Sequence, residues 1–500
     1  MHPVLTMSSI PSASSNSSST SATSPPTPPA ASGQALRAEF RALWQLAWPL
    51  LIGQLATVGM AVADVAMAGH ASAQDLAGVS LGTSIWIIVV VTLMGVMMAV
   101  TPLVAHHVGA QEFSKVPHLV RQALWMSVGV GTIALVLANL STLIFDHMVL
   151  EPAVRTIAQQ FIYITSVALP AFAAYRVLYG YSASLNQTKP MMVISLLALL
   201  LNVWLNWLLV FGNWGLPRLG GVGCAWASMV CVWFNLAGLI WWMRRSPAYA
   251  STWPFTQWER PNRAEIGRLL HLGLPIGVTY FAECSAFSLI ALLVAKFGST
   301  QVAAHQIALN FSSLTFMVPL SIGLAVLTRV GQALGAGDPV AARYRSWVGV
   351  AAAVGFSLVS ALIMALFNQQ IASAYTNDAG VAALAASLLF LAAIFQISDG
   401  LQVSTSCAIR GYKITRTPMA IHLTAFWVVS LPLGCVLGLA PDWAPWHPAQ
   451  PMKAQGFWIA LIVGLSVAGS ALAWLLHRIT HQHVAHVARV THIARGGQHA

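Results

Sequence analysis

The sequence predicts an all-α membrane protein with twelve transmembrane helices. Hydrophobic residues make up 57% of the 500 residues and charged residues only 7%, with a mean hydropathy of +0.72; about 25% of the residues in soluble domains are charged. Apolar stretches of 20 or more residues recur from Leu43 to Leu476, each long enough to cross roughly 30 Å of hydrocarbon as a helix. The expected spans are approximately 43–69, 76–104, 118–145, 155–185, 190–212, 220–243, 266–296, 302–334, 346–367, 381–409, 418–440 and 455–477.

The segments between and outside these spans divide the chain into five parts. Residues 1–33 are rich in Ser, Thr, Pro and Ala, and a disordered tail is expected there. Residues 34–243 form a first lobe of six helices, 244–265 an Arg- and Pro-rich cytoplasmic linker, and 266–478 a second lobe of six helices. Residues 479–500 are basic and His-rich; we expect an amphipathic segment on the inner leaflet, with metal sensing as the alternative.

Three motifs marked by proline or glycine occur twice, at an offset of 226 to 228 residues. The pairs are Trp48-Pro49 with Leu274-Pro275, HVGAQE (107–112) with ALGAGD (333–338), and TKP (188–190) with TRTP (415–418). A constant offset indicates two related halves, and because six is an even number both halves enter the membrane from the same side. This arrangement predicts a pseudo-two-fold axis along the membrane normal and a binding site in the cleft between the lobes.

The net charge of +11 orients the chain in the membrane. With both termini in the cytoplasm, the cytoplasmic side holds 18 of the 24 Lys and Arg residues, including Arg410. The opposite side holds four (Arg155, Arg218, Lys296, Lys453) and two lie within spans (Arg176, Arg329). This asymmetry predicts an N-in, C-in topology and attraction to anionic lipid, and removes the reason to expect a nucleic-acid partner.

Three carboxylates lie well inside apolar spans: Asp64, Glu283 and Asp399. An ionisable group at that depth costs about 2.5–3.5 kcal/mol and normally faces a protein interior or a watered cavity. Their negative charge predicts a site for cations. The alternative is a set of buried ion pairs, but Arg176 and Arg329 are two partners for three acids.

Polar and aromatic residues share helix faces with one another or with these acids. Asn202 and Asn206 are four residues apart on one face, where they serve either as ion ligands or in hydrogen bonds between helices. Phe287 follows Glu283 by four residues and Phe395 precedes Asp399 by four, so either ring could contact a bound cation. No HExxH motif occurs, and no metal-enzyme site is predicted.

Several long stretches closely resemble one family of membrane transporters. They are GMAVADVAMAGHASAQDLAGVSLG (59–82), ALLVAKFGSTQVAAHQIALNFSSLTFMVPLSIGLAVLTRVGQALGAGD (291–338), and LNQTKP (185–190) with RGYKITRTP (410–418). Over about residues 40–478 the chain resembles the NorM-like branch of the multidrug and toxic compound extrusion (MATE) family. The resemblance implies a MATE/MOP-type fold of two six-helix lobes around a V-shaped cleft. It also implies an antiporter in the bacterial inner membrane that exports cationic amphipathic compounds in exchange for Na⁺ or H⁺.

The resemblance further implies roles for single residues. Asp64 falls on the family's first-helix carboxylate, Glu283 on the acid of helix seven and Asp399 on the acid of helix ten, all candidate Na⁺ ligands. Asn202 and Asn206 match polar residues that share the first lobe's cation pocket. This chain departs from some members in two places: some branches have Asp at position 206, and some members carry Tyr at position 395.

The residues favour Na⁺ as the coupling ion, with H⁺ as the alternative or an additional ion. Sodium needs several oxygen ligands, whereas a proton needs only a carboxylate of raised pKa. Asn206 can supply an oxygen but cannot titrate, which favours a metal ion in the first lobe. No cofactor other than the coupling ion is expected, and the chain is expected to act as a monomer.

Two other functions compete with drug export. A flippase for a lipid-linked saccharide, within the same superfamily, would carry arginines at mid-membrane depth for its anionic substrate, whereas this chain has an acidic excess there. An intramembrane enzyme would need a nucleophile with a base, or a metal constellation, and the sequence holds neither. We therefore expect no enzyme.

The charge asymmetry yields a test of orientation. In a cysteine-free background, Ser251→Cys should resist a membrane-impermeant maleimide in intact cells, and Asn377→Cys should react, because 251 lies in the cytoplasmic linker and 377 on the opposite side. Labelling at position 251 without labelling at position 377 would reverse the topology.

Overall fold

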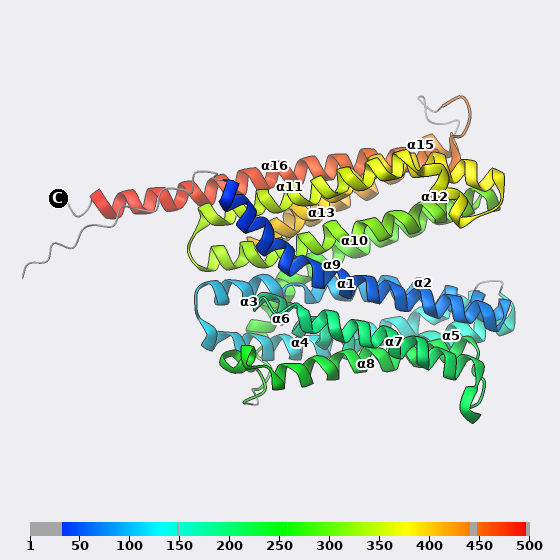
Figure 1. Ribbon diagram of the computed structural model, residues 1–500, viewed down its shortest axis with the longest axis horizontal. Helices are drawn as coiled ribbons and strands as arrows, with labels where there is room; N and C mark the ends of the chain where they lie inside the picture. Colours follow the sequence, from blue (N-terminus) through cyan, green and yellow to red (C-terminus); the bar gives the residue numbers. More distant parts are fainter. Residues whose placement is uncertain (1–32, 148–149, 258, 441–447, 497–500) are drawn as a thin grey trace, which may run out of the picture.

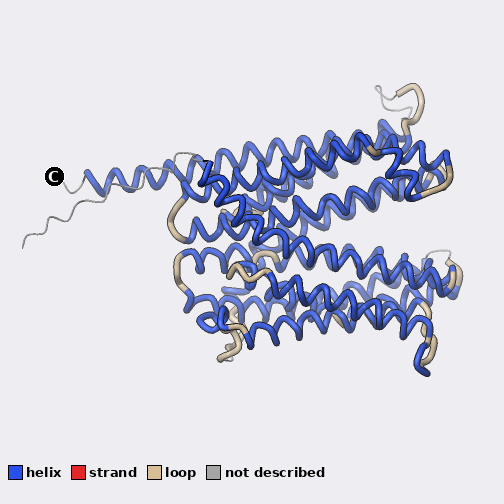
Figure 2. The backbone as a smooth tube through the Cα atoms, in the orientation of Figure 1, coloured by secondary structure: helices blue, strands red, loops and turns tan. Residues whose placement is uncertain are grey.

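The computed structural model describes residues 33–147, 150–257, 259–440 and 448–496, so most of the Ser- and Thr-rich tail predicted over 1–33 lies outside the described residues. Within these ranges the chain forms helices and short turns, without a β-strand (Figure 2). The predicted all-α class is confirmed.

The number of membrane spans also agrees with the prediction. Eleven helical segments of the described chain are long and apolar enough to cross a membrane. A twelfth span consists of α5 and α6, which are bent by 47° where they join. The helices are α1 (Gly33–Ala71), α2 (Ala73–Met97), α3 (Val100–Gly109), α4 (Val116–Ser141), α5 (Pro152–Ser166), α6 (Leu169–Ser184), α7 (Lys189–Phe211), α8 (Gly221–Arg245), α9 (Arg263–Ala295), α10 (Ser299–Gly335), α11 (Pro339–Leu366), α12 (Asn368–Tyr375), α13 (Ala379–Gly411), α14 (Arg416–Leu423), η5 (Thr424–Ser430), α15 (Leu431–Leu439) and α16 (Lys453–Gly496).

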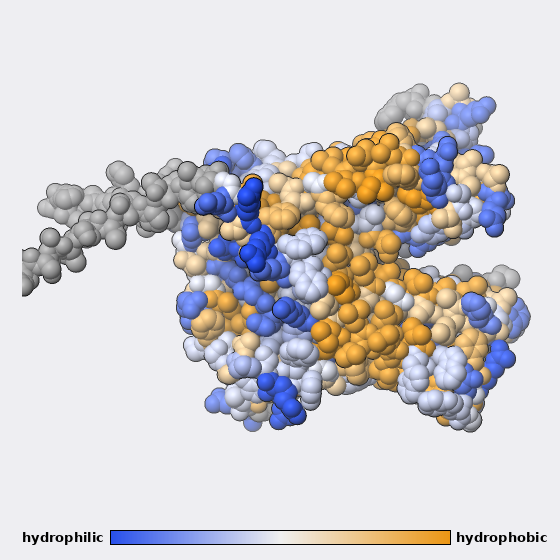
Figure 3. Space-filling model, viewed as in Figure 1, coloured by the Kyte–Doolittle hydropathy of each residue, from blue (hydrophilic) through white to orange (hydrophobic). Residues whose placement is uncertain are grey.

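The helices form two lobes (Figure 1). Helices α1–α8 build the N-lobe and α9–α16 the C-lobe, and the two lobes are joined near the end that carries both described chain ends. We call this the terminal end and the opposite one the far end. At the far end a notch separates the lobes in the space-filling view (Figure 3).

Apolar side chains on the outside of the lobes and polar side chains inside them are the pattern of a protein surrounded by lipid. On α4, Val136, Leu137 and Leu140 are about half exposed, whereas Gln122 and Ser127 are buried. Apolar residues form a broad band across the middle of the molecule, and polar residues gather at its two ends (Figure 3). Because exposed leucine and valine are stable in hydrocarbon but costly in water, this pattern identifies a multi-pass membrane protein.

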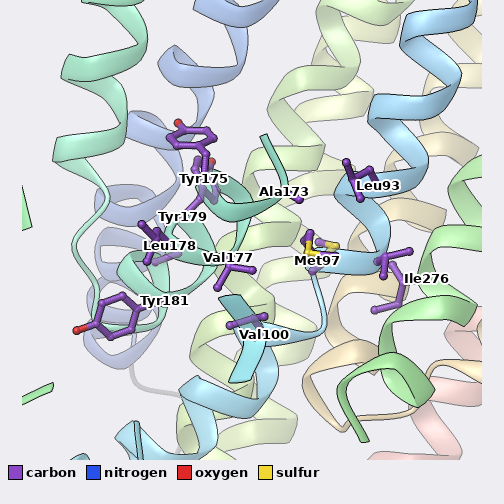
Figure 4. Packing of buried hydrophobic residues seen from close by; sticks show 14 of the residues in the cluster. Leu93, Met97, Val100, Ala173, Tyr175, Val177, Leu178, Tyr179, Tyr181 and Ile276 are labelled. Carbon is purple, nitrogen blue, oxygen red and sulfur yellow. The ribbon is translucent and has the colours of Figure 1, made fainter. Parts of the chain in front are cut away.

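Apolar side chains join the lobes where α2 packs against α9. Ile276 of α9 belongs to the same buried cluster as Leu93 and Met97 of α2 (Figure 4). Glycine permits this approach: a Cβ atom at Gly273 would lie 2.3 Å from the carbonyl oxygen of Val96. The two helix backbones are therefore nearly in contact across the lobe boundary.

At a second crossing, between α3 and α10, a glycine of each helix lies against a backbone carbonyl of the other helix. A Cβ atom at Gly109 would lie 2.0 Å from the Gln332 carbonyl oxygen, and one at Gly335 would lie 2.0 Å from that of His106. Residues 109 and 335 are 226 positions apart, as are 106 and 332. The pseudo-two-fold axis predicted from the repeated motifs therefore passes through this crossing.

At this crossing, one side chain from each lobe donates a hydrogen bond to a backbone carbonyl of the opposite lobe. His106 Nε2 lies 3.0 Å from the carbonyl oxygen of Gly411 at the end of α13, so the ring donates a hydrogen bond there. Gln332 Nε2 donates to the carbonyl oxygen of Ser184 at the end of α6, at 2.9 Å. We call these two contacts the paired inter-lobe hydrogen bonds.

An ion pair also joins the lobes at the terminal end. Arg329 of α10 donates two hydrogen bonds of 2.6 Å to the carboxylate of Glu39 in α1, and Arg345 lies 3.8 Å from the same carboxylate. Arg329 therefore has a carboxylate partner close to the chain end of α1. It forms no ion pair with an acid deep inside the spans.

The linker between the lobes packs against the N-lobe. Trp125 Nε1 donates to the Glu259 carbonyl at 2.9 Å, and Gln122 accepts a 2.7 Å hydrogen bond from the backbone N–H of Asn262. Hydrogen bonds from Arg121 and His118 hold the pKa of the Glu259 carboxyl below its usual range. The segment between α8 and α9 is thus attached to α4.

The last helix extends beyond the predicted lobe boundary at 478. Helix α16 continues to Gly496 and projects away from the lobes at the terminal end (Figure 1). No Gly or Pro occurs between residues 470 and 495, so no residue in this stretch favours a break. The His-rich segment up to Gly496 therefore continues α16, and its expected place on the inner leaflet stays a prediction.

The crossing of α3 and α10 predicts a large effect of a single methyl group. Gly109→Ala should lower the stability of the purified protein by about 1–3 kcal/mol, because the added carbon meets backbone that cannot rotate away. Gly129→Ala is the matched control, since a Cβ atom there has nothing within 4 Å. Thermal unfolding in detergent measures the difference. Equal unfolding temperatures for the two variants would contradict the close crossing.

Candidate functional site

Asp64 lies inside the N-lobe and is held by amides of α7. Its side chain is 6% exposed, and those of Asn202 and Asn206 are fully buried. Asn202 Nδ2 donates to Asp64 Oδ1 at 3.0 Å, and Asn206 Nδ2 donates to the same oxygen at 2.6 Å. The face shared by the two asparagines is therefore directed at the carboxylate of α1.

A fourth residue, Ser228 of α8, completes this group and was not predicted from the sequence. Its Oγ donates to Asp64 Oδ2 at 2.5 Å. Asn206 Oδ1 is buried and accepts no hydrogen bond from the described residues. We call Asp64, Asn202, Asn206 and Ser228 the N-lobe pocket. A single serine in an apolar helix is a weak signal, because its hydroxyl usually bonds to its own backbone.

Glu283 of α9 and Asp399 of α13 lie together in the C-lobe. Asp399 is 4% exposed and Glu283 is half-buried. Asp399 makes no hydrogen bond with any described residue. We call these two residues the C-lobe acids.

The two predicted aromatic residues place the C-lobe acids at the same depth. The rings of Phe287 and Phe395 meet edge to face with centroids 6.2 Å apart. Phe287 is one turn after Glu283 on α9 and Phe395 one turn before Asp399 on α13. Because α9 and α13 run in opposite directions across the membrane, both acids lie on the same side of the aromatic pair.

These rings also belong to the packed interior of the lobe. Phe287 lies 6.0 Å from Phe426, and Phe395, which is 4% exposed, lies 5.5 Å from Trp458. The aromatic group is therefore part of the buried apolar cluster of the C-lobe. Whether either ring touches a bound cation stays a prediction.

No basic residue of the described chain forms an ion pair with Asp64, Glu283 or Asp399. Arg176, 9% exposed, stacks on the ring of Tyr179 at 4.4 Å, and Arg329 pairs with Glu39. The alternative in which the three acids are neutralised by these arginines is therefore not formed in this structure.

Arg410 corrects the assignment of charges made from the sequence. It was counted in a cytoplasmic connection, but it lies inside α13 and is only 4% exposed. Its guanidinium lies 3.3 Å from Tyr280 Oη and 3.4 Å from Met98 Sδ, at the boundary between the lobes. Glu283 follows Tyr280 by three residues on α9 and so lies about one turn from the residue that Arg410 contacts. The sequence placed Arg410 in the connection because the predicted apolar span ends at residue 409, whereas α13 continues to Gly411.

The described residues contain no group of three His, Cys, Asp or Glu side chains that could hold a metal ion. The acids instead form two separate sites, one inside each lobe. A two-lobed bundle of membrane helices with carboxylates buried near the middle of its spans is the architecture of a membrane transporter.

Comparison with known proteins identifies the family. The MatE family profile matches residues 49–208 and again residues 275–436, together more than half of the chain. The starts of the two matches are 226 residues apart, in agreement with the repeated motifs. The chain belongs to the MatE family, as its resemblance to multidrug and toxic compound extrusion proteins predicted.

Curated relatives place it in the NorM-like branch. The multidrug resistance protein PmpM of Pseudomonas aeruginosa is 44% identical over 449 residues, which cover 89% of this chain and 93% of that protein. A probable multidrug resistance protein NorM of Chromobacterium violaceum is 39% identical over 453 residues, covering 90% of this chain and 96% of that protein.

Solved structures share the fold. The crystal structure of the eukaryotic MATE transporter AtDTX14 superposes with a TM-score of 0.80 at 20% identity, covering 90% of this chain and 99% of that one. A MOP superfamily transporter of Pyrococcus furiosus, described as having a binding pocket of reverse polarity, gives 0.78 at 16% identity, covering 90% and 98%. The fold alone therefore does not specify the polarity of the pocket, and the function must be argued from the residues.

Proposed function

We propose that this protein exports cationic amphipathic compounds across the bacterial inner membrane in exchange for Na⁺, with H⁺ as the competing coupling ion. The observation that carries the proposal is the pair of C-lobe acids, neither of which forms an ion pair with a basic residue of the described chain. Relatives named as multidrug resistance proteins supply the substrate class. Cells would then hold the N-terminus and the linker in the cytoplasm, and the far-end notch would face outward.

Coupling follows from competition for negative charge. A carboxylate neutralised by Na⁺ or H⁺ no longer attracts a cationic drug, so the ion and the drug exclude each other at Glu283 and Asp399. For transport, the ion must also bind one arrangement of the lobes better than the other, because a ligand shifts a conformational equilibrium only by its differential affinity.

The N-lobe pocket favours a metal ion over a proton. In this structure the amide N–H groups of Asn202 and Asn206 donate to Asp64. Turning either amide by 180° would replace a donor by a carbonyl oxygen. Together with Asp64 and the Ser228 hydroxyl, this would provide the several oxygen ligands that hard cations require.

Two alternatives have less support. A flippase for an anionic lipid-linked saccharide needs accessible arginines in the cleft, whereas Arg176 and Arg410 are buried against Tyr179 and Tyr280. For an intramembrane enzyme, the Ser228 hydroxyl that donates to Asp64 is the one contact between a possible nucleophile and a deep acid in the described chain. The named relatives are multidrug resistance proteins.

Neutralising either C-lobe acid should abolish export against a gradient. Glu283→Gln and Asp399→Asn should each slow ethidium efflux from energised vesicles at least 10-fold, because an amide carries no negative charge to attract the drug cation or to compensate the coupling ion. Glu151→Gln, at the exposed start of α5, should keep the wild-type rate. Wild-type efflux by both variants of the C-lobe acids, at equal expression, would exclude the proposed role.

Separately imposed ion gradients distinguish the coupling ions. Export should require Na⁺, and Ser228→Ala should raise the Na⁺ concentration for half-maximal export about 10-fold, because one oxygen ligand is lost. Thr132→Ala removes a hydroxyl that bonds only to its own helix and should leave this concentration unchanged. Full-rate export on a pH gradient in Na⁺-free buffer, without any effect of added Na⁺, would assign the coupling to H⁺.

A further inference from the structure

A pocket of about 1060 Å³ opens between the lobes at the terminal end, far from the buried acids. The N-lobe contributes its walls from the end of α3 and the start of α4. The C-lobe contributes the start of α9 and Lys413, which lies in the turn between α13 and α14. Any molecule bound there would touch both lobes.

The walls of the pocket are layered. Each of three helices places a basic residue at the outer turn and a leucine four residues deeper: His107 and Leu103 on α3, Lys115 and Leu119 leading into α4, and Arg268 and Leu272 on α9. Four residues of helix correspond to about 6 Å. The pocket therefore has a cationic rim above an apolar floor, repeated on three sides.

The rim carries more positive charge than its carboxylates neutralise. Its cations are Lys115, Arg268 and Lys413, with His107, His118 and His271 beside them, and Glu265 is the acid in its lining. Glu265 pairs with Arg268 at 3.1 Å. Two carboxylates that do not line the pocket also pair with rim residues: Glu112 with Lys115 and His107, and Glu259 with His118.

Lys413 and His271 are left without an anion. Within the described chain neither side chain forms an ion pair or a hydrogen bond. Lys413 is half-buried, and its burial together with the charge of Arg268 lowers the pKa of its ammonium group. A partly desolvated ammonium group next to a guanidinium group is stabilised by a bound anion, which restores the lost solvation.

We propose that this pocket binds the phosphate headgroup of an anionic phospholipid from the adjoining leaflet, with the acyl chains against the leucine floor. The phosphate would lie between Lys413, Arg268 and His271. A free phosphate ion would use the rim alone and leave the apolar layer uncovered, whereas a phospholipid matches both layers. Basic pockets between helices at the cytoplasmic side of membranes are sites of this kind.

Lipid binding would favour the arrangement of the lobes seen in this structure. The pocket exists because α3 and α4 lie beside α9 and the turn after α13, so moving the lobes apart at the terminal end would divide it. A ligand that binds one conformer preferentially stabilises that conformer. The proposal concerns a lipid that stays bound, and does not depend on which compound or ion the protein transports.

Binding to the purified full-length protein tests the site. Phosphatidylglycerol should bind at least 10-fold more tightly than phosphatidylcholine, measured by native mass spectrometry from detergent. Arg268→Gln combined with Lys413→Gln should remove most of this preference. The matched control is Arg244→Gln, an exposed arginine at the end of α8 outside the pocket. Millimolar inorganic phosphate should not displace the lipid.

A second variant tests the same site in case the double variant does not fold. His271→Glu adds a negative charge on an exposed side chain, and should weaken phosphatidylglycerol binding while leaving thermal unfolding in lipid-free detergent unchanged. Equal binding of the two lipids, or phosphatidylglycerol binding that survives both variants, would overturn the proposal. Displacement of the lipid by inorganic phosphate would overturn it in favour of a small-anion site.

Discussion

The need to compensate charge inside a membrane governs the internal arrangement of this protein. Each deep acid must find its partners within the helix bundle, since lipid offers none. Asp64 finds three donors on α7 and α8, so these helices have to hold a fixed register with α1. The C-lobe acids are compensated much less, because neither forms an ion pair within the described chain. The two lobes therefore surround their deep acids differently in a similar backbone.

Much of the fold could be predicted because membrane helices have long, simple signals. Apolar length yielded the twelve spans, and the spacing of Pro49 from Pro275 indicated the repeat. Asn202 and Asn206 were found because residues four apart share a helix face. These inferences depend only on lengths and spacings along the chain, which a sequence specifies.

Contacts between helices distant in the chain were the part that could not be predicted. Ser228 meets Asp64 only because α8 packs beside α1, and Arg410 was misplaced because its burial depends on Tyr280 of another helix. The layered pocket needs the ends of α3 and α9 to lie side by side. Spacing along a single helix contains no information on such neighbours. Resemblance to a family can supply it only for residues that the family's motifs include.

The paired inter-lobe hydrogen bonds have a consequence for how such a chain can diverge. Contacts related by a two-fold axis are those of a symmetric dimer, in which residue i meets residue j and j meets i. In a dimer of identical subunits, a change to one side is imposed on the other. Joining both halves in a single chain removes that restriction. The crossing of α3 and α10 keeps its dimer-like symmetry, while the position equivalent to Glu283 in the N-lobe holds Thr57. Covalent fusion thus allows one interface to stay symmetric while the two lobes specialise in different chemistry.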